Sequence, residues 1–145
     1  MDAASHSLSG SCHCGAIQVT ITATKPASEL QVRACQCGFC RRQGAMTISD
    51  PAGRAVIEIA AGAMQPYAFG TRTATSLLCR HCGVYAGAYL WEGAHAWSIA
   101  NVRGLAIPGF EDRAGEPMHY EHETADQRVA RRKQRWTPTE IRFKL

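Results

Sequence analysis

CQCGFCRRQG, residues 35–44, places three thiols within six residues of the chain. The spacing C-x-C-x-x-C lets one short loop wrap a single ion, and thiolates are natural zinc ligands. A buried zinc site usually takes four protein ligands, whereas three ligands and an open position are typical of a catalytic zinc. We expect Gly38 to turn the backbone between the ligands through a left-handed conformation, which glycine adopts at little cost. The loop is therefore interpreted as a reactive metal site built from Cys35, Cys37 and Cys40.

Two further thiol pairs lie on either side of this loop in the sequence. Cys12 and Cys14 form a C-x-C pair, and Cys79 and Cys82 form a C-x-x-C-G turn whose amides can donate to coordinating sulfurs. Four ligands from these pairs and three from the loop account for all seven cysteines. A metal that joins segments more than sixty residues apart constrains the unfolded chain strongly, which is the task of a structural zinc.

Disulfides and iron–sulfur clusters are the alternatives to zinc. Disulfides usually pair cysteines across longer loops in secreted proteins, whereas tight cysteine clusters in cytosolic chains more often bind metal. The usual cysteine spacings of iron–sulfur proteins are not matched in this chain. The sequence therefore predicts zinc as the cofactor, with two ions per chain because the thiols divide into four and three.

The composition is that of an ordinary globular protein. Of the 145 residues, 46% are apolar and 19% are charged, and the formal charge of +4 does not require a nucleic-acid partner. No apolar run approaches the roughly 18 residues of a membrane span, and residues 1–9 lack the apolar core of a signal peptide. We therefore expect a cytoplasmic protein without membrane segments.

Alternating apolar and polar residues predict a series of short strands. Ile17, Val19 and Ile21 alternate with polar residues, which is typical of a half-buried strand. A strand over residues 30–34 leads into Cys35, so we expect the three-thiol loop to lie at a sheet edge. Short strands separated by Gly and Pro indicate a mainly β fold. Further strands are predicted at residues 46–48, 56–60, 65–69, 74–78, 84–91 and 96–102.

The end of the chain changes character. Residues 111–126 are rich in acids, and residues 128–135 form a basic run. We expect a short surface helix over residues 126–134. The basic run could contact nucleic acid, but a solvated helix paired with nearby acids is the favoured interpretation. Those acids are Glu121, Glu123 and Asp126.

These patterns predict one zinc-binding β domain over residues 1–145. Its core is expected at about residues 10–102, and a helical or irregular appendage at about 103–145. We expect residues 1–9, which are small and polar, to form a frayed arm.

The thiol motifs, in their order along the chain, resemble those of a known enzyme family. C-x-C-G, then C-x-C-x-x-C-R-R, then C-x-x-C-G resembles the glutathione-dependent formaldehyde-activating enzyme family, which also includes centromere protein V-like proteins. The resemblance covers about residues 10–102 and implies a β-tent fold of folded-over antiparallel sheets. Members commonly carry a histidine and a serine where this chain has Gln36 and Gly38. The resemblance implies a structural zinc on Cys12, Cys14, Cys79 and Cys82, and a catalytic zinc on Cys35, Cys37 and Cys40.

Two functions are consistent with this pattern. In the first, a thiol such as glutathione takes the open zinc position, is held as thiolate, and attacks a small aldehyde such as formaldehyde. The reverse reaction is carbon–sulfur lysis. The alternative is a non-catalytic zinc module that binds a protein or nucleic-acid partner.

Several residues near the thiols have two interpretations each. Arg41 and Arg42 could bind a carboxylate of a thiol peptide, or they could only neutralise the thiolate cluster. Phe39 could form a wall of the pocket. His13 and His81 lie between paired ligands, and we expect them to be solvent-facing or to support the ligands. We expect His119 and His122 to be surface residues, although this pair could cap the open zinc position.

Overall fold

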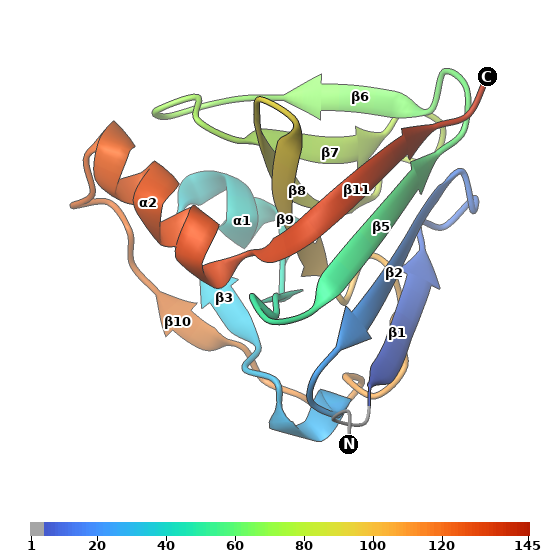
Figure 1. The fold of residues 1–145 in the computed structure, drawn as a ribbon, viewed down its shortest axis with the longest axis horizontal. Coiled ribbons are helices and arrows are strands. Elements are labelled where there is room, and N and C mark those ends of the chain that lie inside the picture. The colour runs from blue at the N-terminus through green and yellow to red at the C-terminus, as the bar shows by residue number, and fades with distance from the viewer. Residues whose placement is uncertain (1–4) are drawn as a thin grey trace.

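Eleven strands and two α-helices follow one another along residues 5–145, the part of the chain that the computed structural model describes (Figure 1). The helical elements are a 3₁₀ turn (Ala27–Glu29), α1 (Gly38–Gln43) and α2 (Ala125–Arg135). The strands are β1 (His6–Ser11), β2 (Ile17–Ala23), β3 (Arg33–Cys35), β4 (Thr47–Ile48), β5 (Arg54–Ile59), β6 (Met64–Tyr67), β7 (Thr75–Cys79), β8 (Tyr85–Glu92), β9 (His95–Asn101), β10 (Glu116–Met118) and β11 (Thr137–Phe143). The predicted mainly β fold with a short C-terminal helix is confirmed.

Strand β9 is the point at which the sheet branches. The main path runs β1-β2-β5-β11-β9-β4-β3-β10, and a second path leaves β9 through β8 and β7 to β6. Residues 96–98 of β9 pair with β11, and residues 100–101 pair with β4. In Figure 1, β1, β2, β5 and β11 lie side by side, and β6 and β7 run at an angle to them at the top of the view. The core lies between these parts of the sheet.

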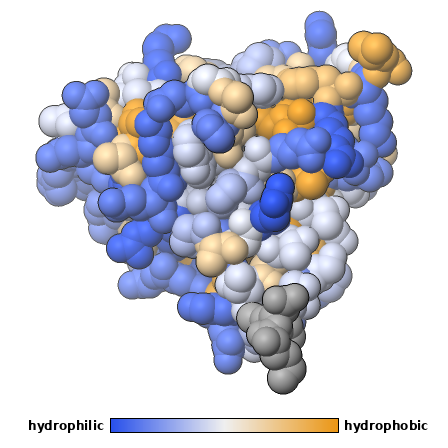
Figure 2. All heavy atoms as spheres, viewed as in Figure 1, coloured by the Kyte–Doolittle hydropathy of each residue, from blue (hydrophilic) through white to orange (hydrophobic). Residues whose placement is uncertain are grey.

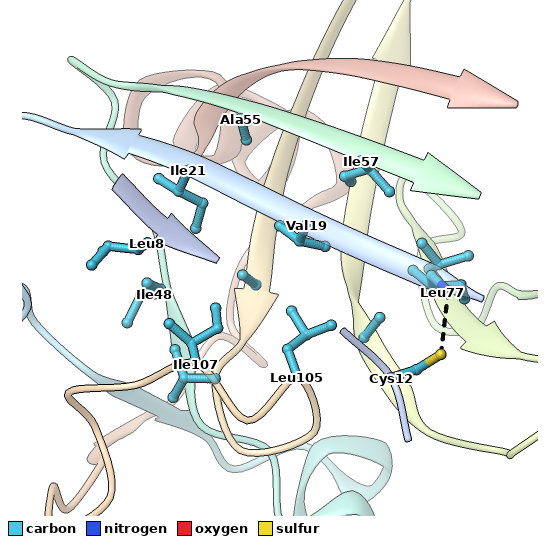
Figure 3. Close-up of a cluster of buried hydrophobic side chains, with 14 of the residues drawn as sticks. Leu8, Cys12, Val19, Ile21, Ile48, Ala55, Ile57, Leu77, Leu105 and Ile107 are labelled. Carbon is cyan, nitrogen blue, oxygen red and sulfur yellow. Dashed lines mark hydrogen bonds between the residues drawn. The ribbon is translucent and has the colours of Figure 1, made fainter. Parts of the chain in front are cut away.

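Strand β2 supplies one row of the main core. Ile17, Val19 and Ile21 are at most 3% exposed, whereas the alternate residues of the strand are exposed, as the sequence pattern predicts. Leu105 and Ile107, from the loop after β9, are buried in the same cluster (Figure 3). This packing holds together the β1–β2 hairpin and the loop after β9, next to the first thiol pair.

The prediction of a frayed N-terminal arm is wrong for residues 6–9. Strand β1 pairs with β2 along its whole length, from His6 opposite Ala23 to Ser11 opposite Gln18. Leu8 is the only large apolar residue of β1, and it is 9% exposed. A strand with one large apolar side chain gives almost no alternation signal, so it depends on backbone pairing with its neighbour. Residues 1–5 of the predicted arm precede this strand, and 1–4 lie outside the described residues.

Strand β11 is an element that the sequence pattern did not reveal. The predicted strands ended near residue 102, yet β11 lies within the sheet, parallel to β5 and antiparallel to β9. Its residues alternate only weakly, because Thr137 is the buried member at one end and Ile141 is half-buried.

Within residues 5–145, no helix is both long and apolar enough to cross a membrane.

The three-thiol segment was expected at a sheet edge, and there the prediction is wrong. Strand β3, which ends at Cys35, pairs with β4 on one side and with the short parallel strand β10 on the other. The amide of Gln36 also donates to the carbonyl of Met118 in β10 at 2.9 Å. Strand β10 therefore fixes the backbone on which the thiols are mounted.

Asp50 joins three separate parts of the fold. Its carboxylate accepts hydrogen bonds from the amide and the hydroxyl of Thr24, both at 2.7 Å, and from the amide of Ala52 at 3.0 Å. Its own amide donates to the hydroxyl of Thr137, the first residue of β11, at 2.8 Å. Burial opposes ionisation of Asp50, but these donors outweigh it and hold the pKa below the ordinary value of 3.8.

Replacing Asp50 with asparagine should lower the free energy of unfolding at neutral pH by about 1–3 kcal/mol, because the amide group cannot accept from all three donors. Since the folded-state pKa is lowered, the carboxylate stabilises the fold above its ordinary pKa of 3.8 and this stabilisation is lost as the pH falls below it. The difference in unfolding free energy between the wild type and Asp50→Asn should therefore become smaller at acidic pH. Denaturant unfolding at several pH values measures it.

Asp112→Asn is the matched control, because Asp112 is exposed and forms no ion pair within residues 5–145. It should leave the unfolding free energy unchanged. Equal effects of the two substitutions at neutral pH would contradict the role of Asp50.

Candidate metal centre and cavity

Four cysteines meet where two turns approach each other. Cys12 and Cys14 lie in the turn between β1 and β2, Cys79 ends β7, and Cys82 lies in the turn between β7 and β8. The four sulfurs all lie within 4.8 Å of one another. Cys12 and Cys79 are at most 2% exposed, so half of the cluster is inside the core. The predicted pairing of these two distant segments is confirmed in space, and we refer to the group as the four-thiol cluster.

The spacing of the sulfurs fits a tetrahedral zinc. The sulfur of Cys14 lies 3.7 Å from that of Cys12 and 3.5 Å from that of Cys79. A tetrahedron with Zn–S bonds of about 2.3 Å has sulfur–sulfur edges of about 3.8 Å. All seven cysteines of the chain are free thiols, so none is committed to a disulfide. The residues of this cluster could hold a zinc ion.

Backbone amides point at the sulfurs of the four-thiol cluster. The amide of Ile17 donates to the sulfur of Cys12 at 3.2 Å, and the amide of His81 donates to that of Cys79 at 3.4 Å. Burial opposes ionisation of Cys82, but the amides of Val84 and Cys14 outweigh it and lower the pKa of this thiol to about 6. Donors of this kind stabilise thiolates, which are the form that binds metal.

The other three cysteines form a second group, here called the three-thiol cluster. Cys35 ends β3, Cys37 precedes α1, and Cys40 lies in the first turn of that helix. Their sulfurs also lie within 4.8 Å of one another. Among residues 5–145, no histidine, carboxylate or further cysteine joins this group as a fourth ligand. The cluster could hold a metal ion and leave one position to another molecule.

Helix α1 begins on one of its own candidate ligands. The sulfur of Cys37 accepts a hydrogen bond from the amide of Cys40 at 3.3 Å, which is the role of a helix N-cap. Hydrogen bonds from the thiols of Cys35 and Cys40, together with backbone amides, lower the pKa of Cys37 to about 2. The expected left-handed turn at Gly38 is wrong, because Gly38 is the first residue of α1. The left-handed glycine is Gly44, which ends the helix with a φ of 59°.

A large cavity opens beside the three-thiol cluster. Its volume is about 750 Å³, and all three cysteines line it. Residues from β3, α1, β7, β8, β9 and α2 and from the loop after β6 contribute to its walls. Segments far apart in the sequence, from Arg33 to Trp136, therefore meet around the thiols.

One side of the cavity is aromatic. The ring of Phe39 lies 5.4 Å from that of Tyr67, 5.1 Å from that of Phe69, and 5.1 Å edge-on from that of Tyr85. All four rings line the cavity, and we call them the aromatic wall. The expectation that Phe39 could form a wall of the pocket agrees with this position. Tyr85 is 3% exposed, and its burial raises the pKa of its hydroxyl, which therefore stays protonated at neutral pH.

Another part of the cavity lining is basic. Arg33 of β3 and three residues of α2 line it, and we call the four residues the arginine wall: Arg33, Arg128, Arg131 and Arg132. In Figure 2, hydrophilic side chains cover the side of the molecule where α2 lies. The basic run was interpreted as a solvated surface helix, and part of that interpretation holds, since Glu123 pairs with Arg128 and Arg131. Its contribution to the cavity was not predicted.

The remaining residues singled out in the sequence lie in different places. Arg42 lines the cavity, and its Nη1 donates to the carbonyl of Gly38 at 3.1 Å. Arg41 is exposed and is not among the residues that line the cavity. The four histidines considered in the sequence are exposed and belong to neither thiol cluster: His13, His81, His119 and His122.

No simple sequence signal could have revealed the arginine wall. An arginine-rich helix near the end of a chain looks the same whether it faces solvent or a cavity. The one available indication is the sequence after the helix, where Trp136 and a run of alternating residues could have suggested a buried anchor and a strand. Trp136 is indeed 4% exposed and also lines the cavity.

Comparison with known proteins identifies the family. The chain resembles a Rhodobacter sphaeroides protein whose crystal structure was determined as a structural genomics target, with 30% sequence identity and a TM-score of 0.57. The match covers 77% of this chain and 99% of that protein. Residues 7–105, more than half of the chain, match the family model described as glutathione-dependent formaldehyde-activating enzyme. The chain therefore belongs to the glutathione-dependent formaldehyde-activating enzyme family.

Proposed function

We propose that this protein is a zinc-dependent carbon–sulfur lyase that forms and breaks the adduct between a glutathione-like thiol and a small aldehyde such as formaldehyde. The observation that carries the proposal is the three-thiol cluster, which has no fourth ligand among the described residues and borders a cavity of about 750 Å³. Membership of the family supports glutathione and formaldehyde as the substrate classes.

The two thiol clusters would have different tasks. Cys12, Cys14, Cys79 and Cys82 would hold a structural zinc, because four thiolates complete its coordination. Cys35, Cys37 and Cys40 would hold a catalytic zinc. A zinc ion with three thiolate ligands and an open position would favour the ionised form of a bound thiol.

The cavity walls would prepare the thiol for reaction. The arginine wall places positive charge beside the thiols and so favours an anionic substrate. The aromatic wall adds apolar surface to the lining, and a less polar surrounding strengthens these electrostatic interactions. Positioning the thiolate and the aldehyde together in this space would convert a bimolecular reaction into an effectively unimolecular one.

The bond changes are simple. The thiolate sulfur attacks the carbonyl carbon, a carbon–sulfur bond forms, and the electron pair of the C=O double bond moves to oxygen. The oxygen takes a proton from water, which gives a hydroxymethyl thioether. In the reverse direction the hydroxyl loses its proton, the carbon–sulfur bond breaks, and the aldehyde and the thiolate separate. Arg42 and the arginine wall would hold the thiol substrate in either direction.

The free thiols also bear on the cellular compartment of the protein. Seven unpaired cysteines in two tight clusters require a reducing environment to stay available for metal. We propose the cytoplasm.

The purified protein should carry two zinc ions per chain, because the thiols form two separate groups. Elemental analysis after purification under reducing conditions measures this ratio. A mild chelator should remove one ion more readily than the other, since three protein ligands bind a metal less tightly than four. A protein that retains one ion and still performs the reaction would contradict the catalytic role of the second zinc.

Substitution of one ligand in each cluster should separate their roles. Cys79→Ser should lower the melting temperature strongly and also abolish activity. The reason is that the four-thiol cluster joins segments 65 residues apart and that structural zinc contributes directly to folding. Cys37→Ser should remain folded, lose one zinc ion, and lose lyase activity. Thermal melts and zinc content are measured for both variants. Equal losses of stability would show that the assignment of roles is wrong.

Glutathione should enter the coordination shell of the metal at the three-thiol cluster. With cobalt in place of zinc, addition of glutathione should change the visible absorption, because a sulfur joins the coordination shell. S-methylglutathione should leave the band unchanged and bind far less well, since its thioether cannot become a thiolate. A spectrum that no thiol changes would overturn the proposed function.

A further inference from the structure

Helix α2 lies outside the part of the chain that matches the family model, which ends at residue 105. Its position is nevertheless well defined at both ends. Thr124 and Gln127 form a capping box, with hydrogen bonds of 2.9 and 3.2 Å between side chains and amides. Trp136, which follows the helix, is buried, and β11 continues directly into the sheet. The helix therefore presents its arginines to the cavity from a fixed support.

Two of these arginines already have a carboxylate partner. Glu123 lies 2.7 Å from Nε of Arg131 and 3.5 Å from Nε of Arg128. The guanidinium of Arg131 also lies 3.6 Å from the centre of the Tyr120 ring. Arg128 donates to the carbonyl of Tyr120 at 2.7 Å. Arg128 and Arg131 are thus largely occupied with holding the segment before the helix.

Arg132 is different. It is half-buried, and within residues 5–145 it forms no ion pair. Its Nη1 donates to the hydroxyl of Thr73 at 2.7 Å, and its guanidinium lies 5.0 Å from the centre of the Trp136 ring. Its Nε is buried without a hydrogen-bond partner in the described part of the chain. Thr73 and Trp136 thus orient a guanidinium that keeps unused donors.

Arg33 faces the same cavity from β3. Its Nη2 donates to the hydroxyl of Ser49, and it too forms no ion pair with any of the described residues. Two guanidinium groups, from elements far apart in the sequence, therefore line one cavity without a carboxylate partner among the described residues.

The charge around the cavity is unbalanced. Its lining contains five arginines, which are the four of the arginine wall and Arg42, but Glu121 is the one carboxylate among them. Even with Glu123 and the net single negative charge of a zinc ion on three thiolates, positive charge remains in excess. Burial, and then the charges of Arg131 and Arg128, lower the pKa of Arg132 to about 10, so this cation lacks compensation.

We propose that Arg132, assisted by Arg33, binds a carboxylate of the thiol substrate while the sulfur occupies the three-thiol cluster. This assignment rests on the proposed function, because the carboxylate site orients the thiol of the same substrate molecule. A planar guanidinium suits the recognition of a carboxylate, and hydrogen bonds between charged groups are stronger than neutral ones. Glutathione, with two carboxylates, one ammonium and a thiol that ionises, is an anion of the kind that this cavity favours. The arginine wall therefore selects carboxylated thiols over neutral ones.

Two small thiols test the proposal on the cobalt-substituted protein. 3-Mercaptopropionate and 2-mercaptoethanol are similar in size, but the first carries a carboxylate and the second is neutral. The wild type should bind 3-mercaptopropionate more tightly, as measured by the change in cobalt absorption. Arg132→Met should weaken the affinity for 3-mercaptopropionate by about tenfold to a hundredfold and change the affinity for 2-mercaptoethanol by no more than about twofold.

Two further variants control for charge and for structural damage. Arg132→Lys keeps the charge but loses the planar group, so its affinity for 3-mercaptopropionate should lie between those of the wild type and Arg132→Met. Arg135→Met, on the same helix, removes an exposed arginine that does not line the cavity and should behave as the wild type. An equal loss for both thiols in Arg132→Met, or a wild type without preference for the carboxylated thiol, would overturn the proposal.

Failure of this proposal can be told apart from failure of the proposed function. If neither thiol changes the cobalt spectrum of the wild type, the open metal position is wrong. Calorimetry with S-methylglutathione then tests the carboxylate site alone, because this probe keeps both carboxylates and cannot bind as a thiolate. Weak binding to the wild type that Arg132→Met abolishes and Arg135→Met retains supports the site. No binding to the wild type, or equal binding to all three proteins, overturns it.

Discussion

Backbone pairing of β11 with two strands at once joins the sheet into one piece. The strand lies parallel to β5 over residues 139–143 and antiparallel to β9 over residues 137–139. On the path of the sheet it is the link between β1-β2-β5, which carry the first thiol pair, and β9, which connects to β3 and to β7. Because each ladder satisfies backbone groups that would otherwise be buried unpaired, the relative position of the two thiol clusters depends on this strand.

The two clusters illustrate how local backbone geometry and metal chemistry support each other. In the four-thiol cluster, turns bring amides to sulfur, so the same groups that shape the turn also stabilise a thiolate. In the three-thiol cluster, the sulfur of Cys37 begins α1, and Cys40 lies in the first turn. Gain or loss of a metal at this position would therefore affect the start of a helix of six residues, whose own stability is small.

The local features of the site could be predicted from the sequence, whereas most of those that arise from distant contacts could not. Cysteine spacing is local, so the three thiol motifs could be read directly, and the count of four thiols in the outer two motifs predicted that these distant pairs meet. The alternation of Ile17, Val19 and Ile21 predicted β2. Strand β1 has one large apolar residue, and β11 is half polar; both form because of partners far along the chain. The direction in which Arg132 points follows from β11 and Trp136, and a basic run carries no such information.

The place of α2 and β11 in the chain has a consequence for biosynthesis. Both follow the segment 7–105 that contains all seven cysteines, so a ribosome releases every cysteine before the arginines of the helix. Domains begin to fold during synthesis, from the N-terminal side onward. If the clusters hold zinc as proposed, a nascent chain can capture the metal while its cavity still lacks the arginine wall, and discrimination between carboxylated and neutral thiols would arise only after that step.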